Sequence, residues 1–203
     1  MTVEPGRGHA STAESLAVAA RELLDGIAVA RSFARGWPDL VATRPIAPRR
    51  LPVLEWLDGA PGCATPATEG LVEAIAAGAG ALAWHQTYTA ADVGAGFLDR
   101  YGWTELVGLR GPIPSETMAC GMLMLGPDTH YPAHAHEAEE LYLPLAGCAL
   151  WKRGRDPYAE RRPGTPIHHP SRIQHAMRTG PEPLLALYVW RGGLAVPSRL
   201  LQI

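Results

Sequence analysis

The second half of the chain is a series of short segments that favour extended backbone. From residue 104 onward the hydrophobic pattern has a period of two, and turn signals such as Gly126-Pro127, Gly147 and Gly180-Pro181 separate the segments. Short strands at even spacing with such turns predict a β-sandwich or β-barrel. The expected strands cover residues 104–109, 117–125, 139–145, 149–153, 165–168, 174–178, 184–190 and 195–200.

The first half favours helices instead. Ser11 and Glu14 have the S-x-x-E spacing of a capping box, ahead of an amphipathic run that we expect to end near Gly36. Thr65-Pro66 predicts a second helix start, with a helix to about residue 83. We therefore expect a disordered N-terminus over residues 1–12, a helical region over 13–103 packing on the barrel, and a barrel over 104–203. The predicted fold class is mainly β with an α-helical N-terminal region.

Composition excludes several classes of partner. The formal net charge is −2, which gives no electrostatic basis for binding nucleic acid or an anionic membrane. No apolar run reaches the roughly 18 residues that a membrane span needs, and residues 1–9 lack the apolar core of a secretory signal. Cys63, Cys120 and Cys148 are odd in number and widely spaced, which argues against a disulfide framework. We expect a cytoplasmic protein with a small-molecule substrate.

The chemistry of the chain is concentrated between residues 130 and 147. His134 and His136 lie two apart, so they share a face in extended backbone, and Glu140 and Tyr142 have the same parity. Two neutral imidazoles and a carboxylate suit Fe(II), Mn, Ni, Zn or Cu. A fourth ligand should come from another strand, and His175 is the candidate. For His130, His168 and His169 a structural role is the expected one.

Two clusters resemble the motifs of the cupin superfamily. His134, His136, Glu140 and Gly147 match the first motif, G-x5-H-x-H-x3–4-E-x6-G, and the segment from Gly164 to Thr179 is similar to the second, G-x5-P-x-G-x2-H-x3-N. Arg172 replaces the middle glycine of the second motif and Thr179 replaces its final asparagine, while Gly126 lies further from His134 than the first motif has it. The resemblance implies a cupin barrel with His134, His136, Glu140 and His175 as metal ligands.

The residues around these motifs resemble one group of cupins, the cupin-type dimethylsulfoniopropionate (DMSP) lyases of the DddQ-like group. The similarity rests on Y-x-x-H-x-H-x3-E-x-Y over residues 131–142, H-x-P-x4-H over 168–175, and Tyr188-x-Trp190. It implies a lyase that cleaves DMSP to dimethyl sulfide and acrylate, with a divalent transition metal (Fe²⁺, Zn²⁺, Mn²⁺ or Ni²⁺) binding the substrate carboxylate. Tyr142 would be the general base, and Tyr131 and Trp190 would bind the sulfonium on their aromatic faces.

Three other readings stay open from sequence alone. They are a cupin Fe(II) dioxygenase, a lyase-like cupin acting on another small carboxylate substrate, and a ligand-binding cupin without enzymatic activity. The third is disfavoured because the chain has no helix-turn-helix with a basic surface. The helical region could cap the barrel mouth or form the interface of a homodimer.

Overall fold

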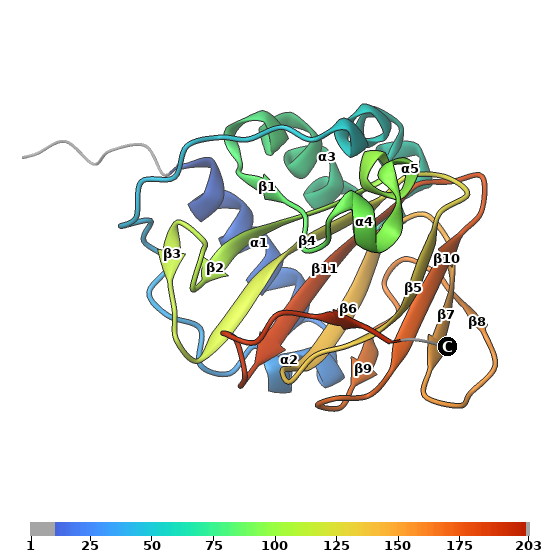
Figure 1. Cartoon of the computed structure of the whole chain (residues 1–203). Helices are drawn as coiled ribbons and strands as arrows, with labels where there is room; N and C mark the ends of the chain where they lie inside the picture. The colour runs from blue at the N-terminus through green and yellow to red at the C-terminus, as the bar shows by residue number, and fades with distance from the viewer. Residues whose placement is uncertain (1–10, 202–203) are drawn as a thin grey trace, which may run out of the picture.

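The computed structural model describes residues 11–201 as two facing β-sheets (Figure 1). The helices within residues 12–33 and 69–78 cover the outer face of one sheet, whereas those within residues 90–99 pack against the core between the sheets. The N-terminal residues that we expect to be disordered lie almost entirely outside the described residues. No helix between residues 11 and 201 combines the length and the apolar character needed to cross a bilayer. The helices are α1 (Thr12–Asp25), α2 (Ala28–Phe33), α3 (Glu69–Gly78), α4 (Ala90–Val93) and α5 (Ala95–Asp99), with 3-10 helices η1 (Pro52–Gly59), η2 (Pro61–Cys63) and η3 (Ala79–Ala81).

The strands form a larger and a smaller sheet. The larger sheet has the order β1-β2-β4-β11-β6-β9 with β3 beside β2, and the smaller has the order β12-β5-β10-β7-β8. The predicted mainly β, cupin-type architecture is confirmed. The strands are β1 (Trp84–His85), β2 (Tyr101–Gly108), β3 (Ile113–Pro114), β4 (Met118–Leu125), β5 (His130–Ala135), β6 (Glu139–Ala146), β7 (Ala149–Arg153), β8 (Ala159–Arg161), β9 (Ile167–His169), β10 (His175–Thr179), β11 (Leu184–Arg191) and β12 (Arg199–Leu200).

The two faces of the larger sheet bury different sets of side chains. On β11, Leu185, Leu187 and Val189 point outward and pack against the helices, in one core with Leu16 and Leu24 of α1. The alternate residues of the same strand point between the sheets, where they form a second core with side chains of the smaller sheet. The site described below lies in this inner core.

The helical region differs in detail from the sequence expectation. The capping box at Ser11 is confirmed, because Ser11 N–H donates to Glu14 Oε2 at 2.5 Å and Glu14 N–H donates to Ser11 Oγ at 3.3 Å. The first helix does not run unbroken to Gly36: α1 ends at Asp25, and Gly26 caps it before α2 begins.

The second helix begins later than the Thr65-Pro66 signal predicts. It starts at Glu69, and its N-cap position is Thr68. The Thr68 hydroxyl donates to the carbonyl of Leu145 at 2.7 Å, which ties the start of α3 to strand β6. Sheet pairing reaches back to Trp84, which pairs with Thr104. The division of the chain at residue 103 stays a prediction, as does the homodimer.

Candidate active site

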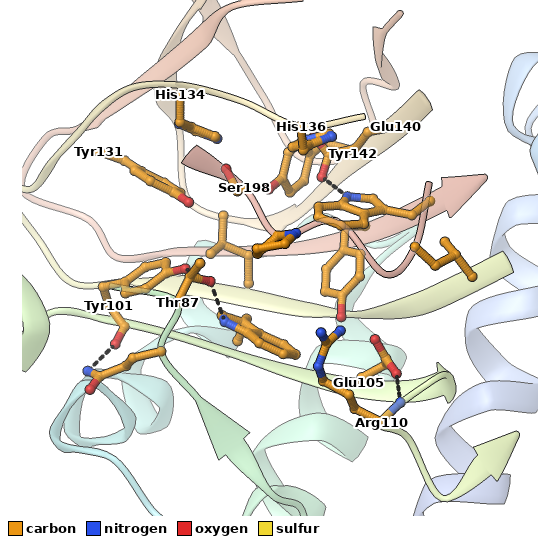
Figure 2. A pocket seen from close by; sticks show the side chains of 17 residues that line it. Thr87, Tyr101, Glu105, Arg110, Tyr131, His134, His136, Glu140, Tyr142 and Ser198 are labelled. Atoms are coloured by element: carbon orange, nitrogen blue, oxygen red, sulfur yellow. Dashed lines mark hydrogen bonds and ion pairs between the residues drawn. The ribbon is translucent and has the colours of Figure 1, made fainter. Parts of the chain in front are cut away.

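A cavity of about 250 Å³ lies between the two sheets, and all the predicted site residues except His175 border it (Figure 2). Its walls come from strands β2, β4, β5, β6 and β11 and from the segment after β11. The lining residues are Gln86, Thr87, Tyr101, Trp103, Glu105, Arg110, Leu123, Tyr131, His134, His136, Glu140, Tyr142, Tyr188, Trp190, Leu194, Pro197 and Ser198.

Three of the four predicted metal ligands form one buried group. One ligand atom each from His136, Glu140 and His175 lies within 4.8 Å of the others. His136 follows the end of β5, Glu140 lies on β6 and His175 opens β10. The Nε2 atoms of His136 and His175 are 3.0 and 3.3 Å from Glu140 Oε2.

The chain around each imidazole fixes its tautomer. Nδ1 of His136 lies 2.9 Å from the carbonyl of Ala138, and Nδ1 of His175 lies 3.0 Å from that of Ile173. A carbonyl can only accept, so each Nδ1 carries a hydrogen. Each Nε2 faces the Glu140 carboxylate and offers a lone pair when the ring is neutral and a hydrogen when it is protonated; against the effect of burial, the charge of Glu140 raises the pKa of His136. Lone pairs that converge on an anionic oxygen repel one another unless a cation or a proton lies between them.

This donor set fits a metal ion. Nε2 of His175 is buried, and no hydrogen-bond partner for it exists among residues 11–201, although Glu140 Oε2 is within 3.3 Å. Two neutral imidazole nitrogens and a carboxylate oxygen are ligands for divalent transition metals. The group could therefore hold a metal ion.

His134 lies beside this group rather than in it. Its ring centroid is 4.0 Å from that of His175 and 6.4 Å from that of His136. Its Nδ1 lies 2.9 Å from the Pro132 carbonyl, so its Nε2 also remains free of a hydrogen. Burial holds the pKa of His134 well below its ordinary value, and the neighbouring His175 adds to the effect. A neutral imidazole is thus available at the border of the group.

Glu140 is fully buried, and contacts on both oxygens keep it ionised. Burial alone would raise its pKa, but the charge of His136 and hydrogen bonds from His136 and His169 hold that pKa well below the usual range. Trp190 Nε1–H donates to Oε1 at 2.6 Å, and the Trp190 ring stacks on His136 with centroids 4.3 Å apart. Trp190, expected as an aromatic face, therefore also orients the carboxylate.

His169 was expected to be structural, and the structure places it against Glu140. The two residues are paired between β9 and β6, and His169 Nδ1 lies 3.4 Å from Glu140 Oε2. Its ring stacks on His175 with centroids 4.1 Å apart, and burial lowers its pKa to about 4. The sequence gave no signal for the contact between His169 and Glu140, because the H-x-P-x4-H motif begins at His168 and leaves position 169 unspecified.

Tyr142 borders the same end of the cavity (Figure 2). Its ring centroid is 6.5 Å from that of His175 and 5.8 Å from that of His169. Burial raises the pKa of Tyr142 well above its ordinary value, and the charge of Glu140 raises it further. A phenolate here needs a nearby positive charge.

Tyr131 belongs to a group of aromatic rings at one side of the cavity. It stacks on His134 with centroids 4.0 Å apart and planes 11° apart. Its hydroxyl is 3.0 Å from that of Tyr88, and its ring centroid is 5.1 Å from that of Tyr101. Tyr88 and Tyr101 were not predicted as site residues. Tyr101, Trp103 and Glu105 alternate along β2, so their side chains share one face of the strand. This alternation is the sequence signal that could have placed them together at the cavity.

Comparison with known proteins identifies the family. The family model for dimethylsulfoniopropionate lyases matches residues 28–186. The chain belongs to the DMSP lyase family. A Ruegeria pomeroyi protein named dimethylsulfoniopropionate lyase DddQ is 34% identical over 157 residues, which cover 77% of this chain and 78% of that protein.

Solved structures of DMSP lyases share the fold along nearly the whole chain. A structure of the DMSP lyases RdDddP and RnDddQII aligns with a TM-score of 0.88 at 34% identity, covering 94% of this chain and 98% of the other. The structure of DMSP lyase DddQ from Ruegeria pomeroyi DSS-3 aligns with a TM-score of 0.86 at 31% identity, covering 93% and 95%. The helical region is therefore a shared part of this family's fold.

Proposed function

We propose that this protein is a carbon–sulfur lyase that cleaves DMSP to dimethyl sulfide and acrylate by β-elimination. The observation that carries the proposal is the buried group of His136, Glu140 and His175 at one end of an aromatic cavity that Tyr142 also borders. Membership of the DMSP lyase family supports the same substrate.

His136, Glu140 and His175 would hold a divalent transition metal, with His134 as the fourth ligand at the border of the group. Fe²⁺, Zn²⁺, Mn²⁺ and Ni²⁺ all accept this ligand set. When bound, such an ion supplies the Lewis acidity that acidifies the C–H next to a carboxylate held at the site. Trp190 and the backbone carbonyls of Ala138 and Ile173 keep the ligand atoms oriented.

Tyr142 is the general base in this proposal. Its oxygen takes the proton from the α-carbon, the carbon–carbon double bond of acrylate forms, and the electron pair of the breaking C–S bond leaves with dimethyl sulfide. The buried phenol holds its proton tightly, so a bound cation is needed to make the phenolate accessible. Tyr131 and Trp190 would bind the sulfonium on their faces, each worth about 0.5–2 kcal/mol.

Headspace detection of dimethyl sulfide tests this function. We expect release from DMSP by protein loaded with at least one of Fe(II), Mn, Ni or Zn. Tyr142→Phe should lower the rate by roughly 100-fold or more, because the base is lost, while metal content measured on the same sample stays near that of the wild type.

Two outcomes would contradict it. Near-normal turnover by Tyr142→Phe would remove the base assignment, and no dimethyl sulfide with any of the four metals would remove DMSP as the substrate. His136→Ala should lose both metal and activity, whereas the matched control His130→Ala, an exposed histidine on β5, should keep both.

A further inference from the structure

One row of residues crosses the larger sheet beneath the cavity. Tyr142 pairs with Tyr188, Tyr188 pairs with Gly121, and Gly121 pairs with Glu105. Paired residues of neighbouring antiparallel strands point to the same face, so the three side chains of the row all line the cavity. With strands about 4.8 Å apart, the row measures roughly 14 Å from Tyr142 on β6 to Glu105 on β2.

Gly121 lets the Tyr188 side chain lie across the sheet. A Cβ at this glycine would be 2.7 Å from the Tyr188 hydroxyl, closer than real contacts allow. The hydroxyl reaches beyond β4 and donates to the Thr104 carbonyl on β2 at 3.3 Å. The Tyr188 ring therefore forms a floor between Tyr142 and Glu105, with the Trp190 ring beside it at a centroid distance of 6.1 Å.

Glu105 ends the row as a buried carboxylate. Its side of the cavity lies opposite the end bordered by His136 and Glu140 (Figure 2). Glu105 Oε1 accepts the backbone N–H groups of Arg110 and Gly111 at 2.5 and 2.8 Å, which fixes the side chain in place. The residue is 8% exposed, whereas Arg110 is exposed. Water therefore screens the guanidinium charge more strongly than the carboxylate charge.

Resting on the proposed function, we propose that Glu105 is a specificity-determining residue that makes the cavity select small acids carrying an onium cation at the far end. The carboxylate of such a ligand would be held at the end with His136 and Glu140. Beside the faces of Tyr131 and Trp190, the Tyr188 ring would offer its cation a further aromatic face, in the field of the Glu105 carboxylate. Neutral acids of the same shape would meet the same walls without this attraction.

Two unreactive ligands of equal shape separate charge from shape. N,N-dimethyl-β-alanine carries a protonated dimethylamino group where 4-methylpentanoate has a neutral branched carbon, and both have a carboxylate. By isothermal titration calorimetry with metal-loaded protein, we expect the wild type to bind the cationic ligand about tenfold more tightly than the neutral one.

Glu105→Gln should lower this ratio to the part that the aromatic faces alone support, and it should leave binding of the neutral ligand unchanged. The glutamine oxygen can still accept the two turn amides, so the turn after β2 is retained. In the matched control Glu116→Gln, an exposed acid outside the cavity, the ratio should stay at the wild-type value. An unchanged ratio in Glu105→Gln would overturn the proposal.

Turnover gives a second readout. Glu105→Gln should raise KM for DMSP about tenfold with kcat within about twofold, because the carboxylate acts on binding rather than on proton removal. If Glu105→Gln fails to fold, Tyr188→Leu replaces it: the Glu105 carboxylate is retained, so a reduced cation preference should persist, and its complete loss would overturn the assignment to Glu105. The binding ratio needs no reaction, so a protein that prefers the cationic ligand yet releases no dimethyl sulfide fails only the proposed function.

Discussion

At the scale of single residues, the site is oriented by the chain segments next to its own ligands. His134, His136 and His175 each place Nδ1 within 3.0 Å of a backbone carbonyl two residues away. All three rings therefore use Nδ1 for the backbone and leave Nε2 as the atom that could bind an ion. The Glu140 carboxylate is oriented by longer-range contacts, from Trp190 on β11 and His169 on β9.

Burying the Glu105 carboxylate lowers the stability of the folded protein as pH rises. Burial raises its pKa above 4.5, and the bonds from the Arg110 and Gly111 amides offset part of this effect. A raised pKa means that the folded protein binds this proton more tightly than the unfolded chain does. The stability that protonated Glu105 contributes is present below about pH 4.5 and is lost as pH rises through the folded pKa.

We therefore predict that Glu105→Gln gains stability relative to the wild type as pH rises. The glutamine does not titrate, so the difference in free energy of unfolding should grow from pH 4.5 upward and then level off. Urea unfolding at several values between about pH 4 and pH 8 measures it. The exposed control Glu116→Gln should track the wild type, and a difference that shrinks with pH would contradict the direction of the shift.

At the scale of elements, turns bring the site residues together. Parity placed His134, His136, Glu140 and Tyr142 on one face, and the expected strand over residues 139–145 matches β6, whereas β5, which ends at Ala135, was not among the expected strands. His136 lies in the intervening turn, where its Nδ1 contacts the Ala138 carbonyl. The ligand spacing and the start of β6 could therefore be predicted from the sequence, whereas the position of His136 in a turn could not, because a ligand on a strand and one in a turn fit the same motif.

The turn at Gly147 leaves no room for a side chain. Gly147 has a φ of +77°, and a Cβ there would collide with the carbonyl of Pro183. We predict that Gly147→Ala lowers the free energy of unfolding by about 2–3 kcal/mol or more, through backbone strain and the collision together. Gly180→Ala is the matched control, because no atom lies within 4 Å of its Cβ position. The control should stay within about 0.5 kcal/mol of the wild type in chemical unfolding.

At the scale of the whole molecule, strand periodicity and turn signals predicted a β-sandwich or β-barrel, and the resemblance to the cupin motifs gave the candidate ligands. Register between strands distant in sequence leaves no such local signal. The row of Tyr142, Tyr188, Gly121 and Glu105 exists only once β6, β11, β4 and β2 are paired. The sequence therefore predicted the site residues whose spacing along the chain forms a motif. Glu105, at the opposite end of the cavity, reaches the site only through strand pairing, which no motif records.

The helices and the larger sheet share one core, which links the stability of the helical region to that of the barrel. Leu24 of α1 is fully buried in the same cluster as Leu187 and Val189 of β11. We predict that Leu24→Ala lowers the free energy of unfolding by about 2–5 kcal/mol, because it leaves a cavity in this core. Val18→Ala, on the same helix but 42% exposed, should cost far less.

The course of unfolding tests this link directly. If the two regions form one cooperative unit, Leu24→Ala should move the transitions seen by far-ultraviolet circular dichroism and by tryptophan fluorescence to the same lower denaturant concentration. The cavity residues stay in place in the folded state, so turnover at 25 °C should stay near the wild-type rate. Separate transitions for the two probes would show that the barrel folds independently of α1, contrary to the single shared core.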